Sequence, residues 1–221
     1  MISPPCRERS RAAFPALMPS AMTRARPSGR PAGPEAADLH LKYAQAAAQL
    51  GDSDAARRAV AAAHEAAERD HNDDLLELGG EFALSEASRH YCAGAILVGL
   101  KGAEHEAAAE IERAVSLYEA GPTAGEQHYF GAKALASIDL ATVRLRSGAL
   151  DAATATLQPV LALPPTQRVA KLSRRMRVVR AELAAPLFSR SAAARELDEQ
   201  IEEFTSDSVT NGLHTLPGGP A

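Results

Sequence analysis

The chain contains 221 residues, which is enough for one domain with a sizeable hydrophobic core. Hydrophobic residues make up 46% of the sequence but aromatic residues only 4%, and no segment alternates polar and apolar residues over a full strand length, so composition predicts an all-α fold. The net charge of −4 is uneven: residues 1–34 carry six arginines against one acid, which leaves −9 for the remainder. An acidic body of this kind argues against direct DNA binding by the chain.

Residues 1–34 contain seven of the 14 prolines, and this composition predicts a disordered N-terminal arm rich in proline and arginine. The arm is interpreted either as a basic segment that contacts DNA or an acidic partner, or as a linker remnant. A second disordered tail is expected at residues 208–221, so the folded domain should span residues 35–207. No apolar run approaches 18 residues and no signal peptide is recognisable, which predicts a cytoplasmic protein without a membrane partner.

Helical periodicity predicts about eight helices within residues 35–207. The first four are expected at 35–50, 53–69, 75–100 and 104–120. A fifth helix should end at Arg146, and a sixth should lie between Gly148 and Pro164. The last two are expected at 167–185 and 191–205. Residues 70–74 should form a solvated polar loop. The expected inward stripes are Leu39, Tyr43, Ala46, Ala47 and Leu50 in the first helix, Val169, Leu172, Met176, Val179 and Leu183 in the seventh, and Leu197, Ile201 and Phe204 in the last.

The stretch from Ile138 to Pro165 has the pattern of a helical hairpin around Gly148. Ala141 lies seven residues before this glycine and Ala153 five residues after it, where two helix backbones approach closely. The same offsets recur around two other glycines, and a fourth copy centres on Phe188 without a glycine. The matching residues are Ala44, Gly51 and Ala56 in the first copy, Ala95, Gly102 and Ala107 in the second, and Ala181 and Ala193 in the fourth.

This repeated pattern resembles the tetratricopeptide repeat, although the centres are 51, 46 and 40 residues apart rather than 34. The resemblance implies a right-handed solenoid of about four tetratricopeptide-like hairpins. Residues 159–204 also resemble the C-terminal end of actinobacterial regulators of the xenobiotic-response-element (XRE) type, which join a helix-turn-helix domain to a tetratricopeptide-like regulatory region. No helix-turn-helix domain is present in this chain.

Several residues are candidates for binding a ligand or partner. Arg89, His90 and Tyr91 lie on the third helix, a first helix of its hairpin, and such helices line the concave surface of tetratricopeptide folds. His128 lies near a helix N-terminus, where anionic groups are favoured. The helix at 167–185 carries six cations, namely Arg168, Lys171, Arg174, Arg175, Arg177 and Arg180, which are interpreted either as paired with glutamates of the last helix or as an anion-binding face.

Catalytic and metal motifs are missing from the sequence. His64-Glu65 and His105-Glu106 each begin an HExxH pattern, but Glu68 and Ala109 replace the second histidine, so we expect exposed helix positions and no metal or cofactor. The chain is therefore expected to be non-catalytic, with an enzyme that lacks a recognisable motif as the weakest alternative.

The resemblances imply a sensor or interaction module of an XRE-type regulator that binds a peptide, a small ligand or a protein. They also imply self-association as a homodimer or association with an intact DNA-binding relative. The alternative is a stand-alone tetratricopeptide scaffold that holds two proteins together.

Overall fold

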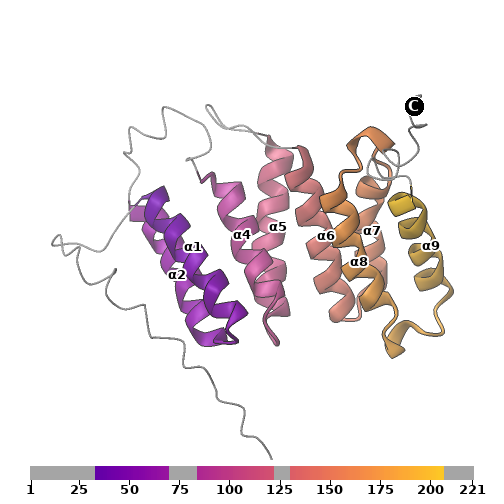
Figure 1. Cartoon of the computed structure of the whole chain (residues 1–221), viewed down its shortest axis with the longest axis horizontal. Coiled ribbons are helices and arrows are strands. Elements are labelled where there is room, and N and C mark those ends of the chain that lie inside the picture. The colour runs from indigo at the N-terminus through magenta and orange to yellow at the C-terminus, as the bar shows by residue number, and fades with distance from the viewer. Residues whose placement is uncertain (1–32, 70–83, 122–129, 207–221) are drawn as a thin grey trace, which may run out of the picture. The chain divides into compact units, whose positions relative to one another are not determined.

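The computed structural model describes residues 33–69, 84–121 and 130–206. Regular structure in these ranges is entirely helical, which confirms the all-α prediction (Figure 1). Residues 1–32 of the N-terminal arm, the loop at 70–74, His128 and the C-terminal tail lie outside the described residues, whereas Pro34, expected in the arm, is the first residue of the first helix. The helix expected at 75–100 is wrong at its start: residues 84 and 85 are not helical, and the Ser85 side chain caps a helix that begins at Glu86. The α-helices are α1 (Pro34–Gln49), α2 (Ser53–Arg69), α4 (Glu86–Val98), α5 (Glu104–Ala120), α6 (Phe130–Arg146), α7 (Leu150–Leu161), α8 (Ala170–Leu183) and α9 (Ala192–Ser206), with short 3₁₀ helices η1 (Pro165–Gln167) and η2 (Pro186–Phe188).

Glycines shape the turns of the first three hairpins, as their spacing indicates. Gly51, Gly102 and Gly148 have φ angles of 80°, 74° and 78°, in the left-handed region that side-chain-bearing residues rarely adopt. The alanines at the paired offsets lie where the helices of each hairpin meet. Those with no exposed surface are Ala44, Ala56, Ala107, Ala141 and Ala153.

The second hairpin departs from the expected spacing by one residue. Ala95 is only half-buried, whereas the neighbouring Gly94 is buried against α5. A Cβ atom added to Gly94 would overlap Cγ1 of Ile111, so this position requires the absence of a side chain. The backbone of α4 therefore lies close against Ile111 of α5 at Gly94.

The expected inward stripe of α1 is wrong at four of its five positions, and only Ala47 is buried as predicted. Leu39, Tyr43 and Leu50 are 53%, 52% and 87% exposed, and Ala46 is exposed as well. The face that packs on α2 is lined by smaller side chains, because the two helices approach too closely for large ones. The buried residues of α1 are Ala36, Ala37, Leu41, Ala44 and Ala47.

The expected register of the fourth copy is also wrong, since Ala181 and Ala193 are exposed. No tight glycine turn joins α8 to α9; the connection runs through η2, whose Phe188 is buried. This longer connection shifts the contact to Leu183 and Ala194. The other two predicted stripes are confirmed except at Val169, which precedes α8 and is only half-buried. Leu172, Met176, Val179 and Leu183 are buried in α8, and Leu197, Ile201 and Phe204 are buried in α9.

Most helix contacts join elements that are near neighbours in the sequence. The pairs α1–α2, α4–α5 and α6–α7 pack as hairpins, α5 packs on α6, and α8 contacts both α6 and α9. Helix α6 is enclosed by four others, and its residues 134–143 are all buried. Among the described residues, no helix has both the length and the apolar character needed to cross a membrane.

Candidate functional site

The three candidates on α4 point in different directions, because consecutive helix positions are separated by about 100°. Tyr91 hydrogen bonds with Arg175 of α8. His90 instead hydrogen bonds with Glu110 of α5. The buried Nε atom of Arg89 has no hydrogen-bond partner among the described residues. These three residues therefore do not form one ligand-binding group.

Tyr91 and Arg175 surround a buried carboxylate on α6, and we call Tyr91, Asp139 and Arg175 the Asp139 cluster. Asp139 is 1% exposed, and its Oδ1 atom lies 2.8 Å from Nε of Arg175. Its buried Oδ2 atom accepts no hydrogen bond from the residues that the structure describes. The cluster joins α4, α6 and α8, three helices that come first in their predicted hairpins.

Burial controls the ionisation of the Asp139 cluster. Desolvation raises the pKa of Asp139 to about 6, although the positive charge of Arg175 acts in the opposite direction. The pKa of Tyr91 is raised to about 12, first by burial and then by the negative charge of Asp139. Burial alone would lower the pKa of the Arg175 guanidinium, but Asp139 and Tyr91 outweigh that effect and raise it. The ion pair between Asp139 and Arg175 therefore lies in a poorly solvated environment.

Sequence reasoning missed Asp139 because this residue lies inside an apolar run. Ile138 and Leu140 flank it in the first helix of the hairpin that the sequence predicts around Gly148. The available signal is that Asp139 is the single acid of α6 and stands between apolar neighbours, since a buried charge requires a partner. Its partner on α8 is 36 positions away and became visible only with the fold.

The cations of the basic helix divide into two groups. In the first group, Arg180 pairs with Asp198 at 2.6 Å and with Glu202 at 3.1 Å, Arg175 pairs with Asp139, and Arg168 lies over the Phe204 ring at 4.9 Å. Internal pairing with the last helix thus accounts for part of the charge. In the second group, no ion pair with any described residue is formed by Lys171, Arg174 or Arg177.

A groove of about 650 Å³ lies between α8 and α9. Its lining includes Arg177, Arg180 and Arg195 together with Asp198 and Glu199. Both positive and negative side chains line it, so the groove does not present one sign of charge. Of the cations that form no ion pair with a described residue, Arg177 lines the groove, whereas Lys171 and Arg174 do not.

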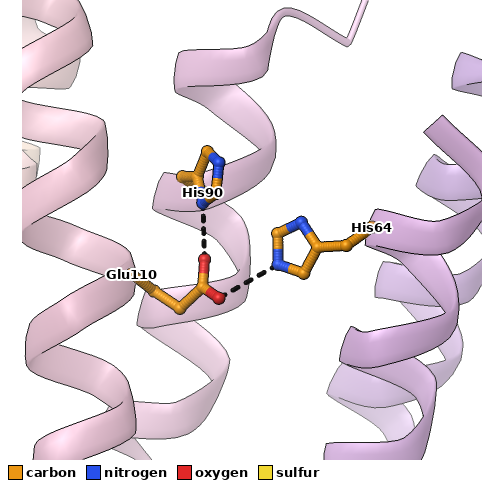
Figure 2. Close-up of side chains that lie close together, drawn as sticks. All are labelled: His64, His90 and Glu110. Atoms are coloured by element: carbon orange, nitrogen blue, oxygen red, sulfur yellow. Dashed lines mark hydrogen bonds and ion pairs between the residues drawn. The ribbon is translucent and has the colours of Figure 1, made fainter. Parts of the chain in front are cut away.

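A second cluster brings together His64 of α2, His90 of α4 and Glu110 of α5, and we call it the histidine–glutamate cluster (Figure 2). The Nε2 atom of His64 lies 3.1 Å from Oε1 of Glu110, and Nδ1 of His90 lies 2.7 Å from Oε2. The side chains are 20%, 18% and 21% exposed in that order. The expectation that His64 is an exposed helix position is therefore wrong, whereas His105 is exposed.

The two histidines keep the Glu110 carboxylate ionised. Burial alone would raise the pKa of Glu110, but the hydrogen bonds from His64 and His90 outweigh burial and lower the pKa to about 2. A further carboxylate, Glu86, lies on the far side of the His90 ring at 3.8 Å from Nε2. Glu86 is itself held by Arg113 at 2.7 Å, and this hydrogen bond lowers the pKa of Glu86.

The spacing of the sequence could not reveal this cluster. His64 and Glu110 are 46 residues apart, and only the packing of α2 beside α4 and α5 brings them together. Comparison of the chain with protein-family models, with curated proteins and with solved structures gives no match. Function is therefore inferred from the charge and geometry of these side chains.

Proposed function

We propose that the chain is a non-catalytic interaction module that binds an acidic segment of a peptide or protein partner. The proposed architecture is a right-handed, tetratricopeptide-like solenoid of four hairpins. Its support is the order of the helix contacts, in which each hairpin packs on the next, and the left-handed glycines at the first three hairpin turns.

The observation that carries the proposal is the division of charge along α8. Acidic residues neutralise Arg175 and Arg180, while Lys171, Arg174 and Arg177 have no ion pair among the described residues. Unpaired cations attract carboxylates over distances of about 8–10 Å at physiological salt. A partner with several carboxylates would supply the counter-charge that the described part of the chain does not.

The Asp139 cluster adds rigidity next to these cations. Lys171 lies one helical turn before Arg175, and its charge acts on Asp139. Because Asp139 and Tyr91 fix the Arg175 side chain, less conformational entropy is lost when a ligand docks beside it. We place the partner segment along α8, where Lys171 and Arg174 contact its carboxylates.

The biological setting is proposed from the resemblance of residues 159–204 to XRE-type regulators. In that setting the chain is a sensor module that associates with an intact DNA-binding relative, and the acidic segment belongs to its ligand or partner. A stand-alone scaffold that joins two unrelated proteins is the alternative. Co-purification of a DNA-binding homologue favours the regulator, and a stable complex with unrelated proteins favours the scaffold.

Self-association as a homodimer is part of the same proposal. The exposed side chains of Leu39, Tyr43 and Leu50 lie on one side of α1, the first helix of the folded region. Exposed apolar residues on a terminal helix are a suitable surface for a second copy, because pairing removes them from water.

Fluorescence anisotropy on the full chain tests the acidic-partner proposal. The probe is a fluorescein-labelled peptide of eight glutamates, and the variant is Lys171→Glu combined with Arg174→Glu. The matched control is Arg58→Glu combined with Arg190→Glu, which makes the same change in net charge at exposed positions elsewhere. We expect the α8 variant to weaken binding by about tenfold or more and the control by about threefold or less. Equal weakening by both variants would contradict binding along α8.

A further inference from the structure

We propose that His64, His90 and Glu110 form a binding site for a divalent transition-metal ion, with Zn²⁺ the best match. Two imidazole nitrogens and one carboxylate oxygen are a common ligand set for zinc. In this chain the three ligand atoms come from three different helices and all lie within 4.8 Å of one another.

The geometry is close to what a metal ion requires. Ligand atoms at about 2.0–2.2 Å from zinc in a tetrahedral site are about 3.3–3.5 Å apart. The two nitrogen–oxygen separations in the cluster are 3.1 Å and 2.7 Å, and the imidazole rings are 4.9 Å apart between centroids. Small side-chain rotations would therefore bring all three ligand atoms around one ion. Without metal, the carboxylate of Glu110 joins the two rings by hydrogen bonds.

The surroundings of His90 also fit a metal ligand. Its Nδ1 atom faces Glu110, while Glu86 lies 3.8 Å from Nε2 on the opposite edge of the ring. This separation is longer than a hydrogen bond, but a shift of about half an ångström would let Glu86 accept from Nε2, and a carboxylate bonded in that way orients a ligating imidazole. Arg113 holds Glu86 in place at 2.7 Å. The ring of His90 is thus oriented with Nδ1 toward the proposed ion.

The charge and exposure of the cluster favour binding. Glu110 supplies a negative charge beside the two rings, and the protons that the rings share with Glu110 would move to their other nitrogens or to solvent when an ion binds. All three side chains are partly exposed, so an ion can enter from solvent and a water molecule can take a fourth position. Because His64 belongs to α2 and the other ligands to α4 and α5, the ion would fasten the first hairpin to the second.

Calorimetric titration of the EDTA-treated, dialysed full chain with ZnCl₂ tests the site. The variants are Glu110→Gln, which preserves the side-chain shape, and His64→Ala. His105→Ala is the matched control, because it removes one exposed histidine from α5 outside the cluster. We expect one tight site per wild-type chain, with affinity lowered about 30-fold or more in both cluster variants and unchanged in the control.

Thermal unfolding gives a second readout that does not depend on the heat of binding. Zinc at a hundredfold excess over its dissociation constant should raise the Tm of the wild-type chain by about 5 °C or more, and should raise the Tm of the cluster variants by much less. Circular dichroism establishes that each variant is folded before titration. Absence of zinc binding by the wild-type chain, or equally tight binding by folded Glu110→Gln and His64→Ala variants, would overturn the proposal.

Discussion

Asp139 and Arg175 form a 2.8 Å ion pair between α6 and α8 in which the second carboxylate oxygen has no hydrogen-bond partner among the described residues. A buried charge of this kind is costly, because desolvation outweighs the attraction of one partner. Burial accordingly raises the pKa of Asp139 from 3.8 to about 6. The ion pair connects two helices and at the same time makes the stability of the fold depend on pH.

The first prediction concerns the pH dependence that Asp139 imposes. Between about pH 4 and pH 6 the folded chain retains a proton on Asp139 that the unfolded chain has lost. The stability contributed by this residue is therefore fully present below pH 3.8 and is lost as the pH rises through about 6. Replacing the residue by Asn should remove this loss.

Urea unfolding of wild type and Asp139→Asn at pH 4 and pH 7.5 measures the effect. We expect the difference in unfolding free energy to move in favour of the variant by about 1–3 kcal/mol as the pH rises. Asp151→Asn on the exposed surface of α7 is the control. A pH-independent difference between Asp139→Asn and wild type would show that Asp139 does not titrate in this range.

The second prediction concerns Glu110 in metal-free buffer with EDTA. Here the stability contributed by the residue falls as the pH is lowered, which is the opposite of the pH dependence at Asp139. The pKa of Glu110 is lowered from 4.5 to about 2 in the folded chain. The folding stability that this carboxylate contributes is therefore fully present above pH 4.5 and is lost as the pH falls toward 2. Glu110→Gln should cost about 1–3 kcal/mol at pH 6, because charge-assisted hydrogen bonds to both histidines are weakened.

Chemical unfolding at pH 6 and pH 3 measures this difference, with Glu68→Gln on the exposed side of α2 as the control. The destabilisation caused by Glu110→Gln should shrink at the lower pH, whereas the control should stay near wild type at both. A variant as stable as wild type at pH 6 would mean that the hydrogen bonds seen between α2, α4 and α5 contribute nothing measurable.

The third prediction separates two roles of glycine. Alanine in place of glycine normally stabilises an open helix by about 0.5–1 kcal/mol. Gly94→Ala should instead destabilise the folded chain by about 1–3 kcal/mol, since the added methyl group overlaps Ile111. At Gly51 nothing lies within 4 Å, so Gly51→Ala should cost only the strain of its positive φ, about 1–2 kcal/mol.

Urea denaturation distinguishes the two glycines when a second change is added. Combining Gly94→Ala with Ile111→Val removes part of the overlapping side chain, so the pair should be less destabilising than the sum of the two single changes. No such rescue is expected for Gly51→Ala with Ile111→Val. Additive effects in the first pair would mean that α4 and α5 do not approach as closely as the structure shows.

The sequence alone predicts only some of the helix bounds and buried faces on which these predictions depend. Periodicity and glycine spacing predicted α2 and α5 with their observed ends, and the buried stripe of α8 from Leu172 to Leu183. Those helices either have large apolar residues facing the core or are bounded by glycine and polar residues that mark their ends. Periodicity predicts the wrong stripe for α1 because it favours large apolar side chains as the buried ones, whereas close packing on α2 requires small ones such as Ala37 and Ala44.

Neither side-chain cluster could be derived from spacing. Asp139 meets Arg175, and His64 meets Glu110, only because particular helices of different hairpins lie side by side. Sequence patterns indicate which face of a helix is buried, but they do not indicate which residue on a distant helix meets it. A lone acid at position 139 and a histidine on the inner side of α2 were the available signals.

The fourth prediction concerns self-association through α1. Leu39→Glu combined with Tyr43→Glu places charge on two exposed apolar positions without disturbing the buried alanines of α1. Light scattering coupled to size-exclusion chromatography should give a dimer for the wild-type chain and a monomer for the variant. Leu187→Glu, at another exposed apolar position, is the control and should remain dimeric. A variant that is still dimeric would move the interface away from α1.

The most direct test of the proposed partner binding compares an acidic peptide with DNA on the same full chain. Anisotropy of the labelled eight-glutamate peptide and of a labelled duplex DNA pool is measured at about 150 mM salt, with wild type and with Lys171→Glu/Arg174→Glu. The proposed function predicts saturable peptide binding that the variant loses, together with no binding of DNA by the acidic chain. Tight DNA binding by the wild-type chain, or no peptide binding, would contradict it.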